Sequence, residues 1–250
     1  MTAYRSTPTA RTARAARTVR IAGAVAACAA LSVAATACQV TEDVKKSERT
    51  YMVKGGAKEI SATTSGGNIT VIATDGDSGA IRVTERYRYS EQKPVTEHSV
   101  ANGRLTLKQK NDDCGGTSLT CTVSYDVRVP RSMITDLHTD GGDVVVRGLA
   151  GDIGAETEGG DVTIEESSAK KATARTSGGD VDAEFTGVPD RVDGRTSGGN
   201  VTIRLPKGSY AVDATTSGGT RKVSGPTDGR APHKIKAHTD GGDVSVSSPS

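Results

Sequence analysis

The chain has 250 residues, with no Trp, one Phe and 30 Gly. This composition favours short strands and turns over helices packed on an aromatic core, and it argues against a conventional α/β enzyme. Five of the 32 Lys and Arg, but none of the 30 Asp and Glu, lie in residues 1–37. The remainder is therefore slightly acidic and has no electrostatic footprint for nucleic acid.

Residues 1–37 have the form of a signal peptide. An Arg-rich start is followed by an uncharged stretch of small apolar residues, Ile21 to Ala37, and then by Cys38 and a polar run. The stretch is poor in Leu and Phe, and it is shorter than the about 20 residues of a usual membrane helix. We therefore expect export with removal of this segment, and a retained transmembrane helix is the less favoured alternative.

The residues before Cys38 resemble the lipobox of bacterial lipoproteins, in which small residues precede a Cys that accepts a diacylglyceryl thioether. Ala35-Thr36-Ala37-Cys38 has Ala where Leu or Val is usual, whereas Val25-Ala26-Ala27-Cys28 is a tighter local match with too short an apolar segment before it. We predict lipidation at Cys38, and hence anchoring to the extracytoplasmic face of the cell membrane. Secretion after ordinary cleavage near Ala37 is the alternative.

Residues 38–50 begin with the predicted lipid site and continue as a short polar tether, and residues 51–250 are predicted to form one domain. Apolar and polar residues alternate at Ile81 to Tyr89, at Arg104 to Lys108 and at Thr122 to Val129, which Pro130 ends. This alternation predicts strands with one buried face. We expect them to form an N-terminal β-rich cap whose sheet continues into the rest of the domain.

Two cysteines flank a short polar loop within this cap. An even pair such as Cys114 and Cys121 in an exported domain favours a disulfide over a metal site. A zinc site would need about four ligands, and no CxxC or HxxxH accompanies the pair. We predict a Cys114–Cys121 disulfide that staples a hairpin.

The rest of the domain is an internal repeat of the form Thr-x-Gly-Gly-x-Val-x-Val. From Gly141 onward, the first glycines of successive copies are 18, 19, 20, 20 and 23 residues apart, a spacing that suits the coils of a solenoid. The copies are TSGGNITV (64–71), TDGGDVVV (139–146), TEGGDVTI (157–164), TSGGDVDA (176–183), TSGGNVTI (196–203), TSGGTRKV (216–223) and TDGGDVSV (239–246).

Each copy predicts two short strands around a sharp turn. Apolar or small residues occupy alternate positions on both sides of Gly-Gly, as in Ile153-Ala155-Thr157 and then Val162 and Ile164. We interpret the glycines as turn residues that tolerate a positive φ. One such rung buries too few side chains to offset its conformational entropy, so the copies must stack in parallel sheets.

The chain resembles the bacterial putative-adhesin family, a domain of unknown function found in exported and lipid-anchored proteins. The resemblance covers about residues 50–248: a β-rich start, Val129-Pro130 before the repeats, serial T-x-G-G-[DN]-[VI] units and a late Leu205-Pro206. It implies an all-β fold, a single-stranded right-handed β-solenoid with about seven Gly-Gly-turn rungs, and it supplies no catalytic residues. Arg221 departs from the pattern, because it replaces the usual inward Val.

Acidic residues recur at the turns, and we expect them to accept backbone N–H bonds there rather than to hold metal. Calcium between rungs is the alternative for Asp143, Asp161, Asp180 and Asp243, but Asn200 and Thr220 interrupt the column. His138 and His238 occupy equivalent places that we estimate to be five rungs apart, on the order of 24 Å, which is too far to share one atom. His98 and His233 are expected to be solvated in loops.

The sequence contains no catalytic, metal or phosphate-binding motif, so we assign no catalytic, cofactor-binding or metal residues. We predict a monomeric, noncatalytic binding or scaffolding module whose partner is an envelope protein or glycan. The alternative is a carbohydrate-active β-helix enzyme, a polysaccharide lyase or glycosidase. That class usually has longer rungs and aromatic sugar platforms, whereas the repeats here contribute only Phe185 and Tyr210.

Overall fold

The computed structural model describes residues 43–54, 56–74, 79–110 and 120–249. The chain divides into two units, Met1–Thr41 and Glu42–Ser250, and the description below concerns the second. The predicted signal peptide, Cys28, Cys38 and Cys114 therefore lie outside the described residues. Within the described ranges there is no helix, and accordingly none long and apolar enough to cross a membrane.

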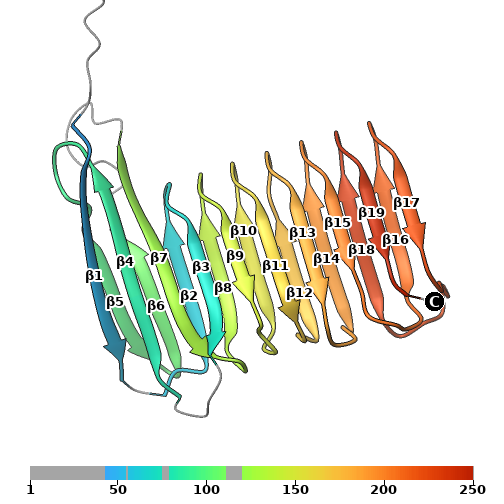
Figure 1. The fold of residues 1–250 in the computed structure, drawn as a ribbon, viewed down its shortest axis with the longest axis horizontal. Coiled ribbons are helices and arrows are strands. Elements are labelled where there is room, and N and C mark those ends of the chain that lie inside the picture. Colours follow the sequence, from blue (N-terminus) through green and yellow to red (C-terminus); the bar gives the residue numbers. More distant parts are fainter. Residues whose placement is uncertain (1–42, 55, 75–78, 111–119, 250) are drawn as a thin grey trace, which may run out of the picture. The chain divides into compact units, whose positions relative to one another are not determined.

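The described strands form two sheets, and this confirms the all-β class (Figure 1). Sheet A contains, in spatial order, β1 (Lys45–Val53), β4 (Ile81–Tyr89), β7 (Cys121–Pro130), β3 (Ile69–Thr74), β9 (Val144–Arg147), β11 (Val162–Ser167), β13 (Val181–Phe185), β15 (Val201–Arg204), β19 (Val244–Ser247) and β17 (Arg221–Ser224). Sheet B contains β16 (Ala211–Thr216), β18 (Lys234–Thr239), β14 (Arg191–Thr196), β12 (Lys171–Arg175), β10 (Ile153–Thr157), β8 (Ile134–Thr139), β2 (Glu59–Thr64), β6 (Arg104–Gln109) and β5 (Thr96–Ala101).

Each Gly-Gly turn joins a strand of sheet B to a strand of sheet A, and we call such a pair a rung. Neighbouring rungs pair in parallel and in register, so that Ala155 lies beside Ala174 in sheet B and Val162 beside Val181 in sheet A. Equivalent positions of the repeat therefore form straight columns, as the predicted stacking requires. The architecture is solenoid-like, and the right-handed sense and the number of rungs stay predictions.

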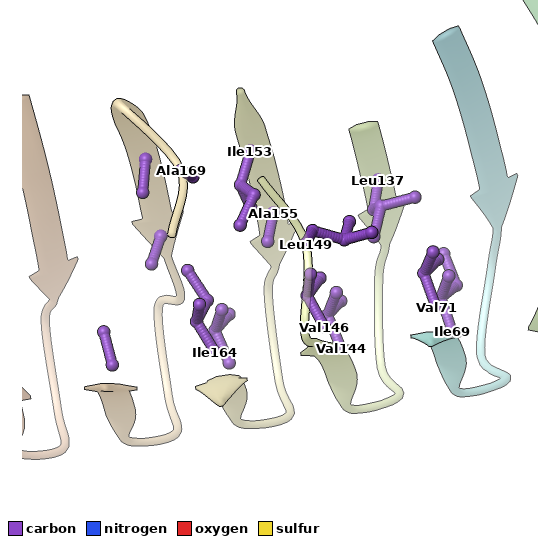
Figure 2. Packing of buried hydrophobic residues seen from close by; sticks show 14 of the residues in the cluster. Ile69, Val71, Leu137, Val144, Val146, Leu149, Ile153, Ala155, Ile164 and Ala169 are labelled. Atoms are coloured by element: carbon purple, nitrogen blue, oxygen red, sulfur yellow. The ribbon is translucent and has the colours of Figure 1, made fainter. Parts of the chain in front are cut away.

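The core lies between the two sheets, where the inward side chains meet (Figure 2). Sheet A contributes Val and Ile, such as Val144, Val146 and Ile164, while sheet B contributes many small residues, such as Ala155. The small residues make room for the large ones. A Cβ added at Gly194 would lie 3.2 Å from Val201 Cγ1 and 3.4 Å from Ile203 Cδ1, tight contacts that the glycine avoids in this dense core.

The N-terminal cap continues both sheets, as predicted from its longer alternating strands. β1 and β4 extend sheet A by antiparallel pairing, and β5 pairs antiparallel with β6 in sheet B. β1 begins at Lys45, so part of the segment that we interpreted as a tether is a strand. The Tyr51 ring of β1 stacks on His98 of β5 at 4.5 Å between ring centroids, and this contact links the edge strands of the two sheets.

The rungs do not stack in the order of the chain. The C-terminal rung β18/β19 lies between β14/β15 and β16/β17, so β16 and β17 are the edge strands at the end of the stack opposite the cap (Figure 1). The edge rung is the one with Arg221 in place of an inward Val. Arg221 is exposed, and its Nε donates to the Ala214 carbonyl of β16 at 2.7 Å. An inward guanidinium at the end of the stack reaches solvent, whereas inside the stack it would be buried.

Candidate functional site

The threonine of each repeat bonds one rung to the next. Thr157 Oγ1 donates to the Gly142 carbonyl of the neighbouring rung at 2.7 Å and accepts from its own Gly160 N–H at 3.2 Å. The same two bonds recur at Thr139, Thr176, Thr196, Thr216 and Thr239. Their hydroxyl groups serve the stacking of the turns, so this column offers no free nucleophile.

The glycines are required for a different reason from the one that we predicted. Among the described residues, the glycines with a left-handed φ all lie outside the Gly-Gly pairs of the seven repeats. The second glycine of each pair instead lies against the neighbouring turn. A Cβ at Gly160 would be 2.2 Å from the Gly142 carbonyl oxygen, whereas a Cβ at Gly159 would be 3.5 Å from its nearest neighbour, the Asp140 carbonyl oxygen. The interpretation as positive-φ turn residues was wrong, because close backbone approach is what selects glycine here.

The acidic column after Gly-Gly accepts hydrogen bonds from the backbone, as expected. Each side-chain Oδ1 of Asn68, Asp143, Asp161, Asp180, Asn200 and Asp243 accepts from the N–H of the equivalent residue one rung along, at 2.7 to 3.1 Å. One oxygen of each carboxylate is thereby engaged. In the described part of the chain no group of three or more His, Cys, Asp or Glu residues could hold a metal ion.

The four histidines lie apart from one another and have partners of their own. His138 Nε2 lies 3.2 Å from Asp140 Oδ1, and His238 Nε2 lies 3.1 Å from Asp240 Oδ1. Because β18 is inserted beside β14, His138 and His238 are four strand positions apart rather than five, about 19 Å at the usual strand spacing. They still cannot act on one atom.

The expectation that His98 and His233 are solvated loop residues was right only in part: His98 is exposed but lies in a strand, whereas His233 lies in a loop but is only partly exposed. His98 belongs to β5 and stacks on Tyr51, as described above. His233 Nδ1 lies 3.0 Å from the Pro189 carbonyl oxygen and 3.4 Å from Asp190 Oδ1. Both rings therefore contribute to local packing.

The predicted lipidation and disulfide residues cannot be assembled into a site from the described residues. Cys121 is the first residue of β7, and the Nε2 of Gln109 lies 4.0 Å from its sulfur. Cys114 lies outside the described residues, so the Cys114–Cys121 disulfide stays a prediction. The same holds for the lipid at Cys38.

Sequence reasoning missed a buried carboxylate in the N-terminal cap. Glu85 is fully buried, and it accepts hydrogen bonds from Tyr51 at 2.8 Å, from Thr96 at 3.0 Å and from Tyr87. Burial, together with the bond to Glu85, raises the pKa of Tyr87 to about 12. The signal was its inward place in the alternating IRVTERYRY segment. With three hydroxyl donors, this carboxylate is a satisfied part of the core.

The outward side chains of the two sheets carry different charge patterns. On sheet A, cations lie beside carboxylates: Arg147 is paired with Glu165, and Arg204 with Asp182. On sheet B, the outward positions of β12, β14 and β18 are Lys171, Thr173, Arg175, Arg191, Asp193, Arg195, Lys234, Lys236 and His238. These nine residues, which we call the basic face, include six Lys or Arg and one carboxylate.

A shallow hollow of about 260 Å³ borders the turn side of the basic face. It is lined by residues of five neighbouring strands of sheet B, including His138, Glu156, Arg175, Arg195 and His238. A second hollow of about 230 Å³ continues along Lys236 and Thr215. The arrangement is a run of polar side chains across the strands rather than one enclosed pocket, so it suits an extended ligand.

Three solved structures similar to the chain are of low sequence identity. A putative cell adhesion protein from Clostridium sporogenes is 15% identical, with 82% of this chain and 100% of that chain covered and a TM-score of 0.48. A putative adhesin from Bacteroides fragilis is 16% identical, with 82% of this chain and 97% of that chain covered and a TM-score of 0.46. A putative lipid binding protein from Parabacteroides distasonis is 15% identical, with 80% of this chain and 96% of that chain covered and a TM-score of 0.32.

The family comparison covers the last cap strand and six of the seven repeats, those from residue 139 onward. No curated protein matches the chain. The model of the Toastrack DUF4097 family matches residues 122–247, from β7 to β19, which is half of the chain. This match confirms the resemblance that the serial Gly-Gly repeats indicated, and the chain belongs to the Toastrack DUF4097 family.

Proposed function

We propose that this protein is a noncatalytic binding or scaffolding module, held at the outer side of the cell membrane by a lipid on Cys38. The observation that carries the proposal is the use of the repeat's polar groups. The Thr and Asp columns at the turns are engaged in bonds between rungs, while the outward positions of both sheets form flat, regular arrays of polar side chains.

A repetitive array binds by many weak contacts rather than by one asymmetric pocket. Solenoid proteins use such extended surfaces for large partners. A catalytic site would instead need a nucleophile, a general base and an electrophile stabiliser converging on one point. The described histidines are far apart, and the buried Glu85 is held by three hydroxyl groups. An envelope polymer or protein is therefore the partner that this surface suits.

Anchoring is tested by changing each candidate cysteine in turn. A Cys38→Ala variant is expected to lose lipid labelling and to leave the membrane fraction, because the thioether can no longer form. The matched Cys28→Ala variant should behave like the unchanged chain. Membrane retention of the Cys38 variant with lipid label still attached would contradict the proposed anchor.

Binding without turnover is tested with the purified full chain and a panel of cell-wall fractions and polysaccharides. We expect at least one polymer to cosediment saturably with the protein and to be recovered at unchanged mass after prolonged incubation. Reproducible cleavage that one Asp or Glu substitution abolishes would replace the proposal with the polysaccharide lyase or glycosidase alternative.

A further inference from the structure

The geometry points to the basic face of sheet B as the binding surface for a linear anionic polysaccharide, a chain with about one carboxylate per sugar. This inference rests on the proposed binding function, to which it adds the ligand class and the location. The face exists because β18 is inserted beside β14, which brings two strands rich in Lys and Arg together.

The cations of the basic face stand in register across three parallel strands. Lys171, Arg191 and Lys234 form one row across β12, β14 and β18, and Arg175 lies beside Arg195 in a second. Neighbours in a row are about 4.8 Å apart, and the two rows, four residues apart along each strand, are separated by about 13 Å. All five side chains are exposed.

Ion pairs within the protein leave much of this charge unmatched. Asp193 lies in the middle of the face, 2.6 Å from Arg195 and 3.6 Å from Arg175. Lys171 lies 3.7 Å from Asp152. Among the described residues, no carboxylate forms an ion pair with Arg191, Lys234 or Lys236, although Asp193 and Asp213 flank Lys236 in register on the two neighbouring strands. Like charges directly opposite each other on neighbouring strands destabilise a sheet.

Several cations elsewhere in the fold lie beside carboxylates instead. Arg104 on β6 lies 2.6 Å from Glu59 on β2, and on sheet A Arg147 lies beside Glu165 in register. In the cap, like charges also lie directly opposite each other, at Lys46 and Arg88 and at Arg82 and Arg128, but each of these pairs spans only two strands. The basic face differs because its row of cations continues across three parallel strands. A polyanion lying across it would supply the missing opposite charges and release their counterions, as occurs when basic surfaces bind charged polymers.

The shape of the face favours a polymer over a small anion or a membrane. The hollow of about 260 Å³ that borders the basic face runs across five strands and is not an enclosed pocket for a single ion. The exposed large apolar residues of the described chain are Met52, Val95, Val100 and Ile134, and all of them lie outside the basic face. Insertion into a bilayer depends on apolar side chains that this face lacks.

The test compares the full chain with two triple variants in binding to polygalacturonate, which carries one carboxylate per sugar. Arg191→Gln/Lys234→Gln/Lys236→Gln removes three cations that form no ion pair among the described residues, so it breaks no ion pair there. The control, Lys46→Gln/Arg82→Gln/Arg88→Gln, removes three exposed cations from β1 and β4, which likewise form no ion pair among the described residues.

We expect the unchanged chain and the control to bind polygalacturonate, and the basic-face variant to bind it about tenfold or more weakly with a shallower dependence on salt. Neutral dextran and monomeric galacturonate should not bind. Equal binding by the two variants, or binding only to phosphatidylglycerol vesicles, would overturn the inference. If the chain binds another polymer intact, the proposed function survives that failure, whereas cleavage of a polymer would remove both.

Discussion

At the scale of single residues, the glycine pair predicts two different responses to the same substitution. Gly160→Ala places a Cβ within 2.2 Å of a backbone oxygen that belongs to the next turn, so the turns must separate. We expect this variant to lose about 1–3 kcal/mol of unfolding free energy, the usual cost of overpacking. Urea denaturation followed by circular dichroism measures the loss.

Gly159→Ala is the matched control, since the nearest atom to its Cβ would lie 3.5 Å away, an ordinary van der Waals distance. Its effect should remain within about 1 kcal/mol and can be stabilising, because alanine restricts the unfolded chain. Equal destabilisation by both variants would mean that close approach between turns is not the reason for the second glycine.

The threonine column predicts that two threonines three residues apart, Thr173 in β12 and Thr176 directly after it, respond differently to substitution. Thr176→Val removes the bonds from Oγ1 to the Gly160 carbonyl and from the Gly179 N–H to Oγ1. We expect a loss of about 1–3 kcal/mol, because two backbone groups lose their partner in a part-buried turn. Thr173→Val, on the outer face of β12, should change stability little, and a comparable loss there would refute the assignment.

The sequence indicated which residues are inward, but not what each inward residue does. Period-2 alternation is a direct consequence of strand geometry, so the buried positions around each Gly-Gly were predictable. A glycine required for a positive φ and a glycine required for close backbone approach look identical in the sequence. Only the structure, through the short distance between Gly160 and Gly142, distinguishes the two cases. Glu85 was hidden because its three hydroxyl partners come from three separate strands or loops.

At the scale of elements, the acidic column predicts insensitivity to calcium. Asp161 Oδ1 accepts the Asp180 N–H at 2.8 Å, and the same bond repeats along the turns, so the column is satisfied without an ion. The melting temperature should be nearly the same in chelator and in millimolar calcium. A rise of about ten degrees or more would show linkage to a specific metal site instead.

The order of the rungs could not be predicted from the repeats. Every rung offers nearly the same inward columns and the same Thr and Gly contacts to its neighbours, so β18/β19 fits beside β14/β15 as well as β16/β17 would. In the sixth copy, Thr220 replaces the Asp or Asn of the other copies, and Arg221 replaces an inward Val, which suits an exposed edge. That signal was visible, but the number of residues between copies favoured simple succession.

At the scale of the whole domain, the two ends of the stack are where the repeat is broken. A sheet edge exposes unpaired backbone groups, so natural proteins cover or charge it. At the cap end, Tyr51 and His98 stack across the edge strands β1 and β5. At the other end, Arg221 and Lys222 of β17 are exposed, and charged edge residues oppose the addition of further strands.

The insertion of the last rung also decides which side chains share a face. With β18 beside β14, Lys234 and Lys236 join the cations of β14 and form the basic face. In chain order, β16 would lie there, with Ala211, Asp213 and Thr215 at the same positions. The basic face, and with it the proposed ligand class, therefore depends on the pairing of β18 with β14.

Disulfide formation between paired cysteine variants tests this strand pairing directly. A disulfide needs Cα atoms about 4.4–6.8 Å apart, a separation that fits register neighbours on adjacent strands but not residues two strands apart. Asp193 and Lys236 are neighbours in register, whereas Asp213 lies one strand beyond Lys236. Under mild oxidation, with peptide mass analysis, Asp193→Cys/Lys236→Cys should cross-link within the chain and Asp193→Cys/Asp213→Cys should not. The reverse result would show that the rungs follow the order of the chain and that the basic face does not form.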